Sequence, residues 1–184
     1  MADATTDSSA MPSASPLPYR RKPVDPLKAT RYPAPVIALA GWLLPGLGYV
    51  LIGETRRGLI AGAAILVLFF AGLLVGGVRV VDVPGFDDDG NRVMLADGRW
   101  SLTAAPHRAV LGKSWYAGQI LAGPVTLAAS VASVQAASSG YPQGTAHLEE
   151  ISTLYCAVAG MLNLVVLMDA AHRAVQARSR GGRR

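Results

Sequence analysis

The chain has 184 residues, of which 51% are hydrophobic and only 16% are charged, and its formal net charge is +5. A soluble globular domain carries about 25% charged residues, so this composition argues against an ordinary soluble domain and favours a membrane protein. Many of the 17 lysine and arginine residues gather near the two ends of the chain, without the aromatic or amide-rich context that reads bases. This pattern argues against a nucleic-acid-binding protein.

The first 34 residues are predicted to form a disordered, basic N-terminal tail (residues 1–34). They are rich in Ser, Thr, Ala and Pro and show no apolar periodicity, so they contain little that could be buried. They also lack the apolar core of a secretory signal peptide. The first apolar run follows the basic cluster directly, as in an uncleaved signal anchor.

Residues 35–81 are predicted to form a transmembrane helical hairpin. Residues 35–52 and 58–78 carry no Asp, Glu, Lys or Arg, and a membrane span needs about 20 apolar residues. Pro45 and Gly46 interrupt the first segment. Membrane helices tolerate such residues when neighbours bond the freed backbone groups. The alternative is a re-entrant first segment that turns back at this point.

Glycines in this region predict close helix packing. The pairs Gly58/Gly62 and Gly72/Gly76 have the small-x-x-x-small spacing of membrane helix contacts. The lysine of a P-loop and the strand of a dinucleotide fold are both missing, which argues against a nucleotide site. The candidate helix-packing residues are Gly46, Gly48, Tyr49, Gly53, Gly58, Gly62, Gly72, Gly76 and Asn163.

Residues 82–114 are predicted to be a polar loop with a small β-hairpin, because two Asp-Gly pairs separate short β-type runs. Residues 115–168 are predicted to contain transmembrane helices 3 and 4, the fourth over residues 151–168. Residues 169–184 are predicted to be a basic C-terminal tail. The fold class expected is therefore an all-α membrane protein with about four transmembrane helices and a β-hairpin-like polar insertion.

Charge distribution predicts the topology. Four spans place both basic ends on one side, and the excess of Lys and Arg there indicates the cytoplasm. Arg56 and Arg57 disagree, because four spans leave them outside. A re-entrant first segment would keep them inside, but the three remaining spans would then place the C-terminal arginines outside. The smaller violation favours four spans.

No set of catalytic or metal-binding residues stands out. The three histidines have no metal-ligand spacing, and the "DDDGN" run lacks the glycine and glutamate positions of a calcium loop. Spans without charge argue against an ion-coupled transporter. Two alternatives stay open. A small transporter or channel subunit would be lined by Gln119, Thr126, Ser130, Ser133 and Asn163. An interfacial enzyme would use Asp87, Asp88 and His107.

The stretch "LLPGLGYVLIGETRRGLI" resembles the two-transmembrane-helix domain of small bacterial membrane proteins. The matching residues are Gly46, Gly48, Tyr49, Gly53, Arg57 and Gly58. The stretch "TLYCAVAGMLNLVVLMDAAHRA" looks like the last helix of an uncharacterised bacterial family of multi-pass membrane proteins. The resemblance implies no established chemistry.

We therefore expect a non-enzymatic, multi-pass protein of the bacterial cytoplasmic (inner) membrane, with both termini in the cytoplasm. Its expected role is structural or in protein interaction, without a cofactor. The expected partners are anionic lipid headgroups at the Arg/Lys tails, and a protein partner or a second copy of the chain, but no nucleic acid.

Overall fold

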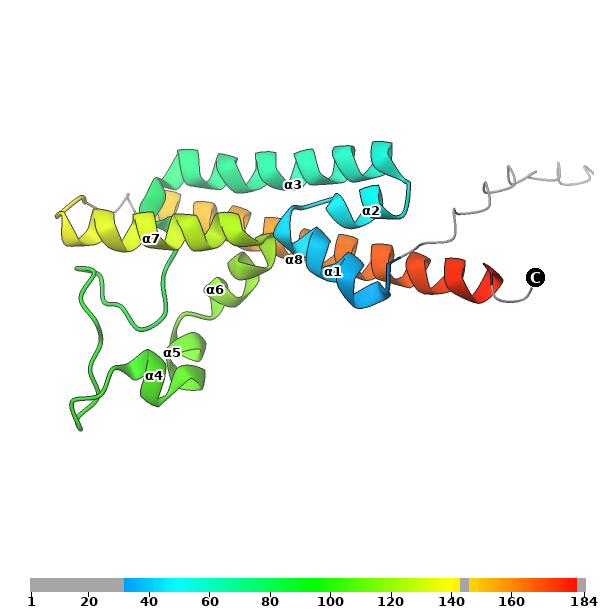
Figure 1. Cartoon of the computed structure of the whole chain (residues 1–184). Helices are drawn as coiled ribbons and strands as arrows, with labels where there is room; N and C mark the ends of the chain where they lie inside the picture. Colours follow the sequence, from blue (N-terminus) through cyan, green and yellow to red (C-terminus); the bar gives the residue numbers. More distant parts are fainter. Residues whose placement is uncertain (1–31, 143–145, 182–184) are drawn as a thin grey trace, which may run out of the picture.

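The computed structural model describes residues 32–142 and 146–181, and this part of the chain is mostly helical without a sheet. Two long helices, α3 (Thr55–Gly76) and α8 (Ala146–Gly181), lie side by side and run in opposite directions (Figure 1). They are the helices of the described residues that are long and apolar enough to cross a membrane. The prediction of four spanning helices is therefore not supported.

The two long helices keep much of their apolar surface exposed. Leu74 and Val67 of α3 are 86% and 69% exposed, and Met168 of α8 is 65% exposed. Only 28% of the most apolar stretch of α3, and 39% of the most apolar stretch of α8, is buried inside the protein. A core helix of a soluble protein would be mostly buried, so this surface favours a lipid environment.

The first apolar segment is a pair of short helices, α1 (Ala34–Leu43) and α2 (Leu47–Leu51). Gly41 packs against Leu167 of α8, and Gly48 packs against Ala170. The chain therefore runs along α8 in α1 and returns in α2. Gly46 makes the reversal with φ +86°, a conformation that favours glycine. We call α1 and α2 the first hairpin.

The third apolar segment also turns back. It consists of α6 (Ser114–Gln119), the 3₁₀-helix η2 (Ile120–Ala122) and α7 (Pro124–Ser138). Gly118 packs against Ala157 of α8, and α7 then returns beside α6, where the Thr126 hydroxyl donates to the Gln119 carbonyl at 2.6 Å. Gly123, with φ +99°, makes the turn. We call these three elements the second hairpin.

The polar region between α3 and α6 contains η1 (Val78–Val80), α4 (Ser101–Ala104) and α5 (Pro106–Gly112). The predicted β-hairpin is not supported. The described residues form two isolated bridges, Phe86 with Arg92 and Met94 with Trp100. The turns expected at the Asp-Gly pairs do form, but the chain becomes helical at Ser101 before a ladder can extend.

The predicted C-terminal tail lies mostly within the described residues, and the predicted N-terminal tail lies mostly outside them. Helix α8 continues to Gly181, so most of the predicted C-terminal tail (residues 169–184) is helical. The predicted disordered tail (residues 1–34) lies outside the described residues up to residue 31.

Candidate functional site

The tips of the two hairpins meet beside the middle of α8, at a place we call the hairpin junction. Proline has no N–H to donate to the carbonyl four residues earlier, so Pro45 leaves the Gly41 carbonyl without its helical donor. At the second tip Pro124 likewise cannot donate to Ile120, whose carbonyl accepts instead from the Gly123 N–H at 3.2 Å. Asn163 of α8 donates its amide to the Gly41 carbonyl at 3.4 Å and to the Leu121 carbonyl at 2.9 Å.

Trp42 completes the junction from the first hairpin. Its indole Nε1 donates to the Ile120 carbonyl at 3.0 Å. Gly123 lies so close to the Trp42 carbonyl that a Cβ atom would clash with it. Asn163 is fully buried. Carbonyls at both tips therefore accept from side chains elsewhere in the fold, and Gly123 packs at the contact without room for a side chain.

The junction lies part-way along α8, one of the two helices that are long and apolar enough to cross a membrane. Asn163 is ten residues from Arg173 at one end and thirteen from Glu150 at the other. At a rise of 1.5 Å per residue these separations are about 15 and 20 Å, close to halves of a hydrocarbon core about 30 Å thick. The first hairpin approaches the junction from the Arg173 end, and the second approaches it from the Glu150 end.

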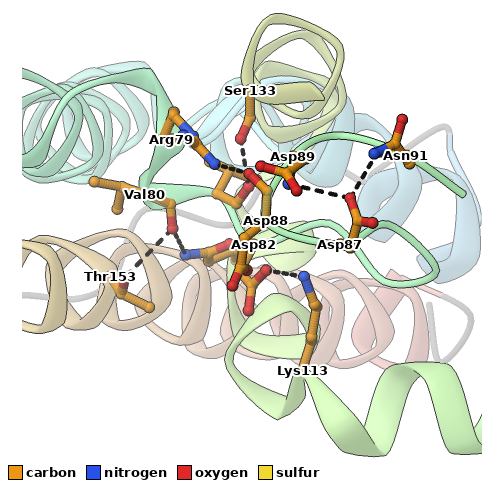
Figure 2. Close-up of polar contacts among 12 residues, drawn as sticks. Arg79, Val80, Asp82, Asp87, Asp88, Asp89, Asn91, Lys113, Ser133 and Thr153 are labelled. Atoms are coloured by element: carbon orange, nitrogen blue, oxygen red, sulfur yellow. Dashed lines mark hydrogen bonds and ion pairs between the residues drawn. The ribbon is translucent and has the colours of Figure 1, made fainter. Parts of the chain in front are cut away.

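Buried polar side chains hold the start of the polar region onto the helices at the Glu150 end (Figure 2). The Val80 carbonyl accepts from Gln119 Nε2 at 3.2 Å and from Thr153 Oγ1 at 3.3 Å. The neighbouring Val81 carbonyl accepts from Ser133 Oγ at 2.8 Å. Three elements, α6, α7 and α8, thus converge on two consecutive carbonyls.

A cleft of about 810 Å³ opens beside this anchor, and we call it the charged cleft. Its two cations already have partners. Figure 2 shows that Lys113 pairs with Asp82 and that Arg79 donates to the Asp88 carbonyl. Arg79 also donates to the Tyr141 carbonyl at 2.6 Å. The cleft is lined by Arg79, Asp82, Asp88, Gly112, Lys113, Ser114, Trp115, Glu149, Glu150, Ile151, Thr153 and Leu154.

The charged cleft has a mixed lining of charged, polar and aromatic side chains. It carries four carboxylates against two cations, together with the half-exposed ring of Trp115. No group of three or more His, Cys, Asp or Glu side chains in the described ranges is arranged to hold a metal ion. The cleft can therefore offer hydrogen bonds, negative charge and an aromatic face to a partner.

A second polar cluster lies at the opposite end, where the first hairpin leads into α3. The Tyr49 hydroxyl donates to Asp169, and Arg173 Nε bonds the same carboxylate at 2.7 Å. Glu54 accepts from Arg173 at 3.2 Å and from Arg57 at 3.3 Å. Burial, with a contribution from Asp169, raises the pKa of Tyr49 from 10.0 to about 12. Tyr49 therefore remains a hydrogen-bond donor at neutral pH.

The predicted packing glycines lie at three places. Gly46 and Gly62 touch backbone across the contact of α2 with α3, where Gly58 also packs, and Gly48 faces α1 and α8. Gly72 and Gly76 pack against α8 near Ser152, whereas Gly53 has open space around it and serves the turn with φ +87°. Asn163 and Tyr49 make the side-chain bonds described above.

The residues proposed to line a transport path are buried and bonded within the protein. Gln119, Thr126, Ser130 and Ser133 bond backbone carbonyls, as Asn163 does. Ser133 also borders a cavity of about 20 Å³, close to the volume that one water occupies. The proposed enzymatic residues are not drawn together: Asp87 Oδ1 accepts from the backbone of Asp89 and Asn91, and His107 belongs to α5.

Sequence reasoning missed Trp42, Glu54, Asp169 and Arg173. Two signals could have found them. The Gly41 carbonyl, which Pro45 leaves without a helical donor, signals that the first apolar segment needs polar partners, and the Trp42 indole is a donor next to it in the sequence. Asp169 and Arg173 are four residues apart on one helix face, where they form an ion pair.

The comparisons with known proteins show a family but no activity. Residues 36–181 match the model of a family of unknown function, DUF6677. No curated protein and no solved structure matches the chain. The resemblance to the two-transmembrane-helix domain is not shown by these comparisons. Because the family model covers most of the chain, the protein belongs to the DUF6677 family.

Proposed function

We propose that the protein is an integral membrane protein with two spans, α3 and α8, and two re-entrant hairpins that enter from opposite faces and meet at mid-depth. The observation that carries the proposal is the pairing of broken backbone with internal donors at the hairpin junction. Irregular backbone occurs at membrane depth only where protein groups or a water-filled cavity satisfy it. The exposed apolar surface of α3 and α8 supports the same location.

Charge supports one orientation. In this topology the face where α1 begins and α8 ends carries twelve of the 17 Lys and Arg residues, seven in residues 1–57 and five in residues 169–184. The other face carries five, all in residues 79–113. The positive-inside rule then places both termini in the cytoplasm. Arg56 and Arg57 lie on this same face, so the conflict that four spans create disappears.

The proposed role is structural or in protein interaction, without catalysis. Its support is that the polar side chains at mid-depth bond the protein's own backbone, while the charged cleft opens on the face opposite the termini. This cleft is the surface we assign to a protein partner in a bacterial cytoplasmic membrane, either another protein or a second copy of the chain.

Site-specific photocrosslinking in intact membranes tests this role. A photoreactive amino acid at Trp115, in the charged cleft, should give a discrete protein adduct. The same group at Leu74, which is 86% exposed on the apolar surface, should give none and serves as the matched control. Equal adducts from both positions, or none from Trp115, would contradict an interaction role for the cleft.

A small transporter or channel subunit is the second candidate. The observation that favours it is the meeting of helix ends at mid-depth, an arrangement that transporters use for binding sites. Under this alternative, liposomes containing the protein should conduct a solute, and N163L should abolish flux while still inserting. Absence of flux, or flux unchanged in N163L, would remove this candidate.

A further inference from the structure

The groove at the start of α3 combines an apolar floor with a basic rim. It measures about 640 Å³ and lies on the surface of the first turns of α3. Ile60, on the floor, is 62% exposed. The groove is lined by Gly53, Glu54, Thr55, Arg56, Arg57, Ile60, Ala61 and Ala64.

The rim carries surplus positive charge. Among the residues that line the groove, the two arginines Arg56 and Arg57 face one carboxylate, Glu54, and Glu54 also pairs with Arg173, whose other partner is Asp169. Arg56 is exposed and forms no ion pair within residues 32–142 and 146–181. Arg57 is held in place by Glu54 at 3.3 Å and by the Tyr49 ring, 5.6 Å from its guanidinium carbon, yet its side chain is 54% exposed.

The position of the groove identifies its ligand. The planar guanidinium group of arginine can donate two parallel hydrogen bonds to the oxygens of one phosphate. Here two arginines lie in the first turn of α3, and apolar residues continue from them along the helix into the proposed bilayer. A soluble anion would contact only the basic rim, whereas a phospholipid would contact the rim with its phosphate and the apolar floor with an acyl chain.

We propose that this groove binds an anionic glycerophospholipid. Arg56 and Arg57 hold the phosphate, and an acyl chain lies along Ile60, Ala61 and Ala64. The inference rests on the proposed membrane location. It assigns lipid recognition to the first turns of α3, in addition to the terminal basic segments.

The test uses the full chain purified into nanodiscs of phosphatidylcholine with and without phosphatidylglycerol. Lipids retained after detergent extraction are measured by native mass spectrometry. The wild type should retain phosphatidylglycerol preferentially. Because each well-placed arginine contributes about 1 kcal/mol, R56Q/R57Q should bind it about 30-fold more weakly. The control R99Q/R108Q removes the same charge from the polar region and should bind like the wild type.

Each result decides the proposal. Equal retention of the two lipids by the wild type, or an equal loss in both double variants, would overturn the lipid site. Displacement of the lipid by millimolar inorganic phosphate would show a simple anion site and also overturn it. Flotation with liposomes, measured first, separates the two proposals: protein that fails to float contradicts the membrane location and the lipid site together, whereas floating protein without lipid preference contradicts the lipid site alone.

Discussion

The two hairpins reach the same junction by different packing chemistry. In the first hairpin, Gly46 and Gly48 let the backbone of α2 approach α3, α1 and α8 directly. In the second hairpin, hydroxyl and amide side chains make the contacts: Gln119 and Ser133 bond the carbonyls of Val80 and Val81. Close glycine contacts thus predominate in the first hairpin, whereas the second hairpin adds several side-chain hydrogen bonds to the glycine contact of Gly118 with α8.

The difference predicts different sensitivities to mutation. A glycine at a backbone contact tolerates no added atom, because neither side can move without displacing a helix. A hydroxyl bonded to a carbonyl contributes less, because interhelical hydrogen bonds in membranes average about 0.6 kcal/mol. We therefore expect the first hairpin to be more sensitive to single substitutions.

The largest effect is expected for G62V. A Cβ atom at Gly62 would clash with the Pro45 carbonyl and push the first hairpin away from α3. We expect a loss of about 3 kcal/mol in the free energy of unfolding, measured by denaturant titration in detergent. Gly112, a helical glycine with open space around it, offers the control G112A, which should stay close to the wild type. Similar stability in both variants would contradict steric packing of this hairpin.

A smaller loss is expected for N163L, which affects both hairpins at once. It removes the donor to the Gly41 and Leu121 carbonyls. We expect about 1.5 kcal/mol of destabilisation, the upper range for such bonds. The control L162A changes a neighbouring side chain that is 46% exposed.

If W42F is combined with N163L, the two losses in unfolding free energy should be non-additive, because both side chains hold the hairpin junction. Strict additivity would argue that the hairpins are independent.

Tyr49 gives a pH-dependent test of the first hairpin. Its pKa in the folded protein is raised above the unfolded value, so its contribution is complete below pH 10 and is lost as the pH rises towards 12. At neutral pH, Y49F should cost about 1 kcal/mol through the lost bond to Asp169. The unfolding free energy of the wild type should fall more steeply than that of Y49F between pH 10 and 12. Parallel curves would show that Tyr49 does not titrate as described.

The smallest effect is expected for S133A in the second hairpin. The substitution removes one bond, to the Val81 carbonyl, and leaves the packing of α7 intact. We expect a loss of about 0.6 kcal/mol, measured in the same titration as G62V. The comparison between hairpins would be wrong if S133A destabilised the protein as much as G62V does.

Much of the fold could be predicted from the sequence, but the two reversals could not. The apolar segments mark the two long helices. The small-residue spacing marks Gly58 and Gly62, which pack against the first hairpin, and Gly72 and Gly76, which pack against α8. Hydropathy reports only that a segment prefers an apolar environment. It cannot tell a complete span from two short helices folded back, because both bury the same residues.

The reversals depend on partners far away in the sequence. Pro45 and Pro124 indicate where helices break, yet a kinked span also tolerates proline. The chain turns back at the two tips because side chains bond the carbonyls there: Asn163 bonds those of Gly41 and Leu121, and Trp42 bonds that of Ile120. These donors are far from most of their acceptors in the sequence, so only the folded structure shows that they lie close enough to bond. The charged cleft is equally non-local, since Asp82, Lys113 and Glu149 come from separate elements.

The most direct test of the two-hairpin topology is cysteine accessibility in sealed vesicles. After replacement of the buried Cys156 by alanine, single cysteines at the exposed positions Thr55, Asp97, Ser139 and Ser179 are treated with a membrane-impermeant reagent. Two spans with two re-entrant hairpins predict that T55C and S179C label from one side and that D97C and S139C label from the other. Labelling of D97C and S139C from opposite sides, as four complete spans require, would contradict the account.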